Sequence, residues 1–237
     1  MLSQFTLLNG FQKAFSSHKI ISISGESGTG KTTLAQFLIG NLLTFSKPYE
    51  DYCFWIQASE TFSKKRLVTM FKIDSEKLKY LNSSILISPG HKACSSFSEQ
   101  SELIRKFSNK NYIFPPNLKF MVIDNISHHL RYEISKLNNA QSVILKLNEF
   151  YESQLLPLIM TCQKEDIILL LIHESSFNPN LNQNKPFFYK LYDRIKSLDV
   201  KLSRDYTSGE RIMTLISRDH SREFKYYISD NGIKILY

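Results

Sequence analysis

Residues 19–43 read KIISISGESGTGKTTLAQFLIGNLL, and this stretch decides the fold. It starts with an apolar run at 19–24, whose length and isoleucine content are typical of a strand buried in a parallel sheet. A helical period of apolar residues follows at 31–43. The segment between them, 25–32, satisfies the pattern G-x-x-x-x-G-K-[ST]. The sequence therefore predicts a strand, a phosphate-binding loop and a helix, in that order.

The glycines of this loop allow the backbone to wrap an anion, so that successive N–H groups point inward at the positive end of the helix dipole. We expect Lys31 to reach the β- and γ-phosphates of ATP and the Thr32 hydroxyl to ligate Mg²⁺. The pattern arises by chance in a chain of this length about one time in a hundred; a glycine-rich turn without a ligand is the alternative. The predicted nucleotide-binding residues are Gly25, Glu26, Ser27, Gly28, Thr29, Gly30, Lys31, Thr32 and Thr33.

A magnesium nucleotide site also needs a carboxylate on a neighbouring strand. Asp124 closes the apolar run at 120–123, which is the form expected of a Walker B aspartate. Because an aspartate at a strand end also occurs for ordinary turn reasons, the assignment depends on the loop upstream. We predict that Thr32 and Asp124 hold the metal and that Lys31 acts on the phosphates.

The rest of the chain predicts an α/β fold. Apolar runs that predict further parallel strands lie at 52–57, 84–88, 120–124 and 167–172. Helical stretches are expected at 63–71, 98–107 and 132–162, and Pro157 is expected to kink or divide the last of them. The segment 178–185, rich in Asn and Pro, is typical of an exposed loop.

The pattern changes after residue 187, where short polar–apolar alternations are separated by turn sequences. They predict antiparallel strands at 198–203, 211–217, 223–229 and 233–236. The predicted fold is therefore a mostly parallel sheet flanked by helices, with an antiparallel C-terminal extension. We expect residues 1–237 to form a single domain.

Composition sets the limits of function. With 237 residues, 42% of them apolar and 22% charged, the chain can bury a full core. The 30 Lys and Arg residues against 22 Asp and Glu residues give a net charge of +8, which permits an anionic partner without requiring one. Three widely spread cysteines favour reduced thiols over a zinc site. The longest aliphatic run, 167–172, is too short to cross a bilayer, so we expect a cytoplasmic protein that makes no membrane contact.

Three stretches resemble the RecA superfamily, most closely the archaeal RadA/RadB recombinase branch. Residues 55–67, WIQASETFSKKRL, are similar to the strand and turn that follow the phosphate loop in that family. Residues 122–131, VIDNISHHLR, look like its Walker B segment, and residues 224–233, FKYYISDNGI, look like its closing strands. The resemblance implies a RecA-like P-loop ATPase core.

The chain departs from the family at two positions near the expected phosphates. The catalytic glutamate of the family falls on Ser59, and Glu60 follows one residue later. Glu60 is our candidate catalytic residue if the backbone bulges there, because adjacent residues of a strand face opposite ways; a solvated or helix-capping role is the alternative. An Asn-Gln pair that senses the γ-phosphate is replaced by His173 and Glu174, where Glu174 is either a displaced general base or a repulsive carboxylate. Both changes put rapid hydrolysis in doubt.

The resemblance implies an accessory protein of DNA recombination and repair that binds single-stranded DNA, a RadA-like recombinase or both. Only about eighteen residues precede the first strand, so we expect no N-terminal helix-hairpin-helix module, as in RadB. The family's DNA-contacting loop corresponds to residues 175–185, which hold one lysine. A KaiC-like or other P-loop signalling ATPase and a catalytically silent nucleotide-binding scaffold stay open as alternatives, and so does a homo-oligomer.

The predicted C-terminal strands carry a second candidate surface for nucleic acid. Basic and aromatic residues alternate there: Arg204, Tyr206, Arg211, Arg218, Arg222, Phe224, Lys225 and Tyr226. Four acidic residues in the same stretch favour an ordinary charged surface instead: Asp205, Glu210, Asp219 and Glu223. The sequence leaves both readings open.

Overall fold

The computed structural model describes residues 2–44, 50–179, 183–205, 207–217 and 220–236. Its sheet has the strand order β10-β9-β8-β7-β1-β5-β4-β2-β3, with β6 paired to β5 outside this path. The strands that run parallel are β1 (Ile20–Gly25), β2 (Tyr52–Gln57), β3 (Ile85–Ser88), β4 (Leu118–Asp124), β5 (Ile168–Asn178) and β7 (Leu198–Arg204). The strands that pair antiparallel with their neighbours are β6 (Gln183–Pro186), β8 (Arg211–Ser217), β9 (His220–Ser229) and β10 (Gly232–Leu236).

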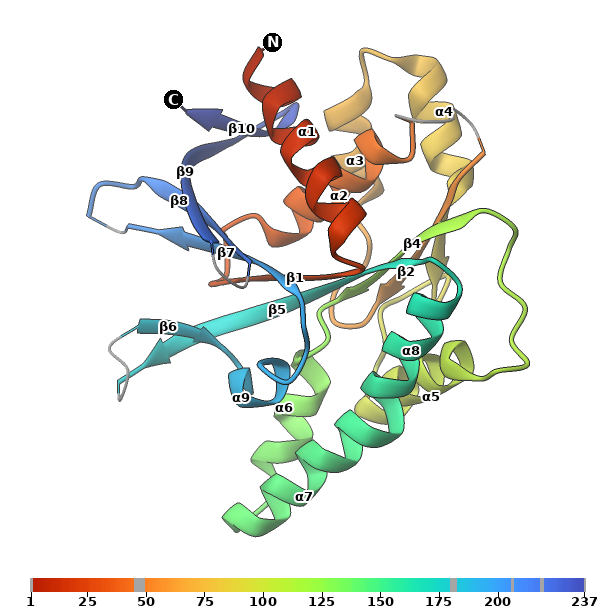
Figure 1. Cartoon of the computed structure of the whole chain (residues 1–237), viewed down its shortest axis with the longest axis vertical. Coiled ribbons are helices and arrows are strands. Elements are labelled where there is room, and N and C mark those ends of the chain that lie inside the picture. The colour runs from red at the N-terminus through yellow and green to blue at the C-terminus, as the bar shows by residue number, and fades with distance from the viewer. Residues whose placement is uncertain (1, 45–49, 180–182, 206, 218–219, 237) are drawn as a thin grey trace.

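Helices cover both faces of the sheet, as Figure 1 shows. One face carries α1 (Leu2–Ser17), α2 (Lys31–Leu42), α3 (Lys64–Phe71) and α4 (Ser75–Ser84). The other carries α5 (Phe97–Ser108), α6 (His128–Ser135), α7 (Ala140–Phe150), a π-helical turn (Tyr151–Leu155), α8 (Leu156–Lys164) and α9 (Tyr189–Tyr192). The predicted α/β fold class, with its antiparallel extension, is confirmed.

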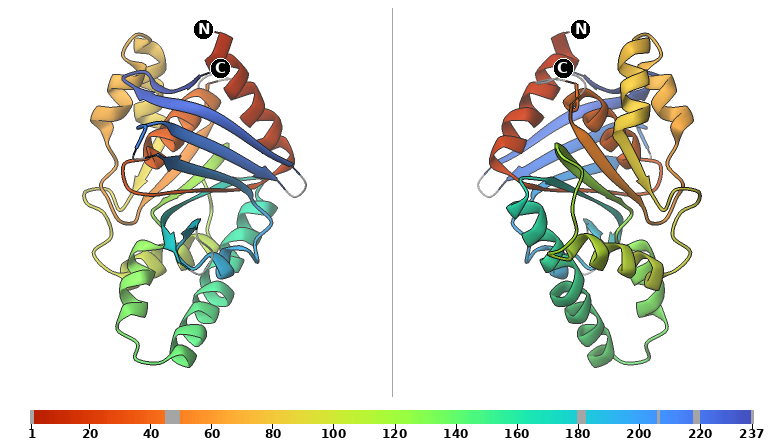
Figure 2. Two further views of the ribbon diagram at one scale, coloured as in Figure 1. Left: turned by 90° about the vertical axis from the view of Figure 1, so that its left-hand side faces the viewer. Right: turned by 90° about the vertical axis from the view of Figure 1, so that its right-hand side faces the viewer.

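Alternating side chains divide the interior into two cores. Along β4, Phe120 and Val122 join the core under α1 and α2, whereas Met121 and Ile123 join the core under α5 and α8. All of these strand residues are buried because the sheet is covered on both faces, which explains why the strands read as unbroken apolar runs. The C-terminal strands extend this sheet, and its last strand, β10, packs against α1 and α2 (Figure 2).

A glycine sets the spacing between α2 and the α3–α4 pair. A Cβ atom at Gly40 would lie 2.4 Å from the Phe71 ring and 3.3 Å from Leu81. The absence of a side chain at this position lets α2 approach both helices closely, so that Phe71 and Leu81 fill the space above it.

The structure corrects two predictions, at 136–139 and at 178–185, and bears out a third at Pro157. The stretch 132–162 is broken at 136–139, where Asn139 caps α7 by accepting a hydrogen bond from the Ser142 N–H, at 2.7 Å. At Pro157 the stretch is divided as predicted, because α8 begins beside the proline directly after the π-helical turn, although the chain stays helical there. The segment 178–185 is not simply a loop, because β5 runs on to Asn178 and pairs with β6; residues 180–182 lie outside the described part.

Three helices were not predicted, α1, α4 and the short α9. For α1 we identified no signal in the sequence. For α4 a cap was present but unrecognised, since Asp74 accepts a hydrogen bond from the Lys77 N–H at 2.9 Å. Within the described residues, none of the helices has both the length and the apolar character needed to cross a membrane.

Candidate functional site

The phosphate-loop glycines adopt the backbone that their sequence pattern predicts. Gly28 and Gly30 have φ angles of 76° and 91°, a region that side chains disfavour. Gly30 lies at the N-terminus of α2, so the loop leads into the positive end of that helix. The loop follows β1 directly, at the carboxyl ends of the parallel strands.

The C-terminal strands support this loop from outside. Tyr226 of β9 donates its hydroxyl hydrogen to the Thr29 carbonyl at 2.6 Å, and its side chain is buried. A Cβ atom at Gly30 would lie 2.6 Å from the side chain of Ile228, also in β9. These two supporting residues come from about 200 positions along the chain, and no local sequence pattern links them to the loop.

Lys31, Thr32 and Asp124 meet at the centre of the site. The Lys31 ammonium donates to the Glu26 carbonyl at 2.9 Å, within the loop itself. The Thr32 hydroxyl donates to Asp124 Oδ2 at 2.7 Å, although the two residues come from α2 and the end of β4. The structure thus places together the three residues that the sequence analysis assigned to phosphate and metal binding.

Burial raises the energy of both central charges. It lowers the pKa of Lys31, against the opposing effects of Glu174, Asp124, Glu60 and Glu26. It raises the pKa of Asp124 to about 6, and nearby Glu60 adds to the rise while the Thr32 hydrogen bond opposes it. A carboxylate held this way gains from a cation, and a hydroxyl beside a carboxylate oxygen is a donor set suited to Mg²⁺.

No group of three or more His, Cys, Asp or Glu side chains forms a metal site within the described ranges. Mg²⁺ does not require such a cage, because it is usually held by one or two protein ligands together with substrate phosphates and water. The Thr32–Asp124 pair fits that mode of binding.

A pocket of about 200 Å³ opens over these residues. Its loop wall consists of the phosphate loop and the start of α2, and its far wall is made by the residues after β2, the end of β4 and Glu174 of β5. The residues that line it are Ser27, Gly28, Gly30, Lys31, Thr32, Thr33, Ser59, Glu60, Asp124, Asn125 and Glu174.

Ser59 and Glu60 both line the far wall. The strand β2 ends at Gln57, and the next two residues, Ala58 and Ser59, both donate their N–H groups to the Asp124 carbonyl, at 2.7 and 3.1 Å. The Asn125 N–H donates in turn to Ser59 Oγ at 3.2 Å, and the peptide bond between Asp124 and Asn125 is cis. Because the strand has ended, side-chain alternation no longer turns Glu60 away from the pocket.

The side chains of His173 and Glu174 lie on opposite faces of the sheet at β5. Glu174 lines the pocket and forms an ion pair with Arg131 of α6 at 3.1 Å, while the Arg131 guanidinium lies 4.3 Å from the Phe187 ring centre. His173 packs against Tyr192 on the α9 side, with ring centres 4.1 Å apart. Burial lowers the pKa of His173 to about 3, so the ring is neutral. Of the two residues, only Glu174 lies where it can meet phosphate.

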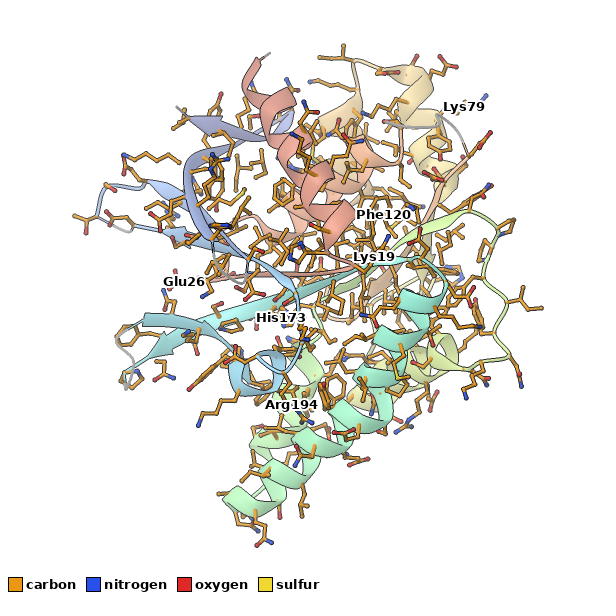
Figure 3. All side chains as sticks on the ribbon, viewed as in Figure 1. Lys19, Glu26, Lys79, Phe120, His173 and Arg194 are labelled. Atoms are coloured by element: carbon orange, nitrogen blue, oxygen red, sulfur yellow. The ribbon has the colours of Figure 1, made fainter. Side chains whose placement is uncertain are left out.

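The β5–β6 hairpin touches the phosphate loop. Asn184 of β6 donates its side-chain N–H to Glu26 Oε1 at 2.8 Å. Figure 3 shows Glu26 at the loop, between the hairpin and the C-terminal strands, with His173 deeper in the molecule. The sequence analysis missed Asn184 and Arg131; Arg131 lay inside the quoted Walker B-like stretch, whereas nothing in the sequence marks Asn184.

The basic C-terminal strands do not present the alternating face that the sequence suggested. Tyr226 points inward to the phosphate loop, and Lys225 is paired with Glu210 at 2.7 Å. Tyr206, Arg218 and Asp219 lie outside the described residues. An ordinary charged surface fits the residues that are described.

Comparisons with known proteins agree with this geometry. A family model described as "ATPase: KaiC" matches residues 6–237. No protein with a curated function matches the sequence. Among solved structures, 326 chains match. One of them, titled "Crystal structure of the RadB recombinase", has a TM-score of 0.68 at 22% identity, over 92% of this chain and 90% of that chain. At that identity the likeness shows a shared RecA-like fold.

Proposed function

We propose, from the premise that this chain belongs to the KaiC family of ATPases, that it is an ATP-binding protein of DNA recombination and repair. ATP would serve mainly as a conformational ligand, with slow hydrolysis. Membership of a P-loop ATPase family implies ATP and Mg²⁺ binding in general. The partner and the hydrolysis rate go beyond family membership and form the content of the proposal.

The observation that carries the nucleotide site is the Thr32–Asp124 hydrogen bond of 2.7 Å. It joins the two side chains expected to ligate Mg²⁺, in a pocket lined by the phosphate loop. The loop N–H groups would hold the phosphates, and Lys31 would exchange the Glu26 carbonyl for a phosphate oxygen. Bound Mg²⁺ would neutralise phosphate charge. Asp124 would then keep its carboxylate ionised without the cost that burial imposes.

The far wall supports slow hydrolysis. A general base must lie within hydrogen-bond reach of the attacking water, and Ser59 has no basic side chain. Glu60 lines the pocket and is therefore the proposed base, but it is exposed, and no hydrogen bond of its carboxylate within the described residues fixes its orientation. Glu174 is a weaker candidate because Arg131 already binds its carboxylate.

Two features support a nucleic-acid or recombinase partner. The similar fold titled RadB recombinase covers nearly all of this chain, and the net charge of +8 favours an anionic partner. The β5–β6 hairpin lies where the RadA/RadB branch has its DNA-contacting loop. It is hydrogen-bonded to the phosphate loop through Asn184 and Glu26. A change at the phosphates would therefore reach the hairpin directly.

The family match also favours a second candidate, a KaiC-like signalling ATPase. Such a protein would hydrolyse ATP or transfer phosphate at a rate that DNA does not change. A silent scaffold would bind nucleotide and partner with no turnover at all.

ATP turnover measured with and without single-stranded DNA, across a salt series, separates the three. We expect slow turnover that DNA alters, with an effect that weakens as salt rises because phosphate contacts release counterions. Turnover that is unchanged by DNA at every salt concentration would favour the signalling ATPase. Nucleotide binding without any turnover would favour the scaffold.

A further inference from the structure

One short segment of the chain carries a clear local excess of positive charge. Residues 61–80, which hold α3 and α4, contain six Lys or Arg residues and two Asp or Glu residues, a net +4 out of the total of +8. The C-terminal segment 198–236 contains seven basic and six acidic residues, a net +1. The segment that holds α3 and α4 therefore carries a larger excess of positive charge than the segment 198–236.

Two of the six basic side chains are engaged within the protein. Arg66 donates to the Ser229 carbonyl at 2.6 Å, and Lys77 donates to Asn41 Oδ1 at 2.9 Å. The remaining four are exposed, and in the described part of the chain none of them forms an ion pair or a side-chain hydrogen bond: Lys64, Lys65, Lys72 and Lys79.

Helical geometry gathers three of these lysines, Lys64, Lys65 and Lys72, on one side of α3. Residues 64, 65, 68 and 72 lie within about 100° of one another around α3, and its buried residues Leu67, Met70 and Phe71 lie outside this arc. Lys79 lies on the outer side of α4, as Figure 3 shows. Figures 1 and 2 place both helices at the end of the molecule away from the β5–β6 hairpin. We call these four lysines and the exposed Val68 and Ile73 the α3–α4 surface.

We propose that the α3–α4 surface binds the phosphate backbone of duplex DNA. The proposal rests on the nucleic-acid part of the proposed function. It adds a second DNA-binding site, distinct from the β5–β6 hairpin. From Lys64 to Lys72 the helix spans about 12 Å, a length over which duplex DNA carries about seven negative charges. The three unpaired lysines within this span therefore face more phosphate charge than they can neutralise.

The residue types favour this partner over the others. Lysine is depleted at protein–protein interfaces, whereas lysine contacts to phosphate supply most non-specific DNA binding. Single-stranded DNA is usually held by aromatic side chains that stack on its bases. The aromatic residues of this segment, Phe62, Phe71 and Tyr80, are all buried. The α3–α4 surface can therefore contact DNA phosphates, but its aromatic side chains are not exposed for stacking on bases.

The test compares two variants with the same net charge. The surface variant carries Gln at the four lysines of the α3–α4 surface. The control variant carries Gln at four other exposed lysines that form no ion pair in the described structure: Lys13, Lys92, Lys110 and Lys196. Fluorescence anisotropy measures the binding of a labelled duplex and of its single strand, each across a salt series.

For the surface variant we expect duplex affinity to fall about tenfold or more at moderate salt. The slope of log affinity against log salt should decrease by about 0.9 for each lysine that contacts a phosphate. The control variant should keep both the affinity and the slope of the parent, and single-strand binding should change little in either variant. If the fourfold variant fails to fold, the double variants Lys64→Gln/Lys65→Gln and Lys72→Gln/Lys79→Gln should each give part of the slope change.

Three results would overturn the proposal. Equal slope changes in the surface and control variants would mean that only total charge matters. Unchanged duplex binding in the surface variant, with single-strand binding intact, would remove this site and leave the proposed function standing. Loss of binding to phosphatidylserine vesicles with duplex binding retained would assign the surface to a membrane. A parent protein that binds neither DNA would instead refute the nucleic-acid part of the proposed function.

Discussion

The two walls of the phosphate pocket differ in how completely they are built. The groups that binding needs are complete: the loop wall supplies glycines at positive φ, Lys31 and Thr32, and Asp124 at the end of β4 bonds to Thr32. The far wall has Ser59 where the RecA-like pattern expects a glutamate, an exposed Glu60, and a Glu174 bound to Arg131. Binding a polyphosphate requires backbone donors and a cation, whereas turnover requires one well-oriented base. This chain has the groups that binding requires but lacks a well-oriented base for turnover.

The two walls of the pocket also differ in the contacts that support them. Tyr226 and Ile228 of β9 fix the loop wall from outside by a hydrogen bond and by close packing. On the far wall the backbone is fixed by the bonds from Ala58 and Ser59 to Asp124, yet the side chain of Glu60 is left in solvent. Rigid support at the phosphates and a free side chain at the expected base fit a protein that holds ATP longer than it hydrolyses it.

The largest effect is expected on the loop wall. Lys31→Ala should weaken ATP binding about 100-fold, because charged hydrogen bonds to phosphate contribute about 1.5–3 kcal/mol and the lysine has no substitute in the loop. Isothermal titration calorimetry with Mg²⁺ and ATP measures the change. Lys13→Ala, at an exposed lysine of α1, is the control and should keep the affinity of the parent. Unchanged affinity in Lys31→Ala would refute the phosphate-loop assignment.

Asp124→Asn is expected to stabilise the ligand-free protein. The pKa of Asp124 is about 6 in the fold against an ordinary value of 3.8, so the folded state holds the proton more tightly. Stability from this group is therefore lost as the pH rises from about 4 to about 6, and above that the ionised carboxylate costs up to about 3 kcal/mol. The variant should unfold at higher urea than the parent at about pH 8, with a smaller difference near pH 5, and should lose the extra stability given by Mg²⁺ and ATP.

Asp205→Asn is the control for that measurement. The side-chain hydrogen bond from Ser208 holds the pKa of this exposed carboxyl below its usual range, so its removal should bring no gain in stability at high pH. An Asp124→Asn protein that is less stable than the parent at about pH 8 would show that the hydrogen bond from Thr32 outweighs the cost of burial.

The sequence predicted the phosphate loop and Asp124 well because the information for each is local. A phosphate loop between a strand and a helix occupies a few adjacent residues, and Asp124 follows an apolar run that is recognisable by itself. The fold class followed from the same runs, since both faces of the sheet are covered. The break at 136–139 was missed because the apolar period continues on both sides of it.

The far wall and its contacts depend on residues that only the fold brings together. Glu60 lines the pocket because β2 ends at Gln57, a boundary that apolar patterning does not locate to one residue. Arg131 reaches Glu174, and Asn184 reaches Glu26, across 43 and 158 positions of sequence. Adjacent residues such as His173 and Glu174 could be assigned to opposite faces only once the covering helices were known.

The smallest effects should come from the far wall, where the two glutamates are expected to act differently. Glu60→Gln should lower ATP turnover about tenfold and leave ATP affinity unchanged, because it removes the proposed base and no phosphate contact. Glu174→Gln should raise ATP affinity about threefold, because it removes a negative charge from the pocket at a site where solvent weakens repulsion. Steady-state turnover and calorimetry measure the two effects. Glu133→Gln, whose carboxylate is paired with Lys136 on the helix of Arg131, is the matched control.

The pair of results decides what the far wall does. If Glu60→Gln leaves turnover unchanged and Glu174→Gln lowers it, Glu174 is the base, and its ion pair with Arg131 must open during the reaction. If neither variant changes turnover but Ser59→Glu raises it, the far wall is that of a degenerate ATPase in which the position of the catalytic glutamate is intact and only the residue has been lost. In that case the hydrogen bond from the Asn125 N–H to Ser59 Oγ marks where the missing carboxylate would begin.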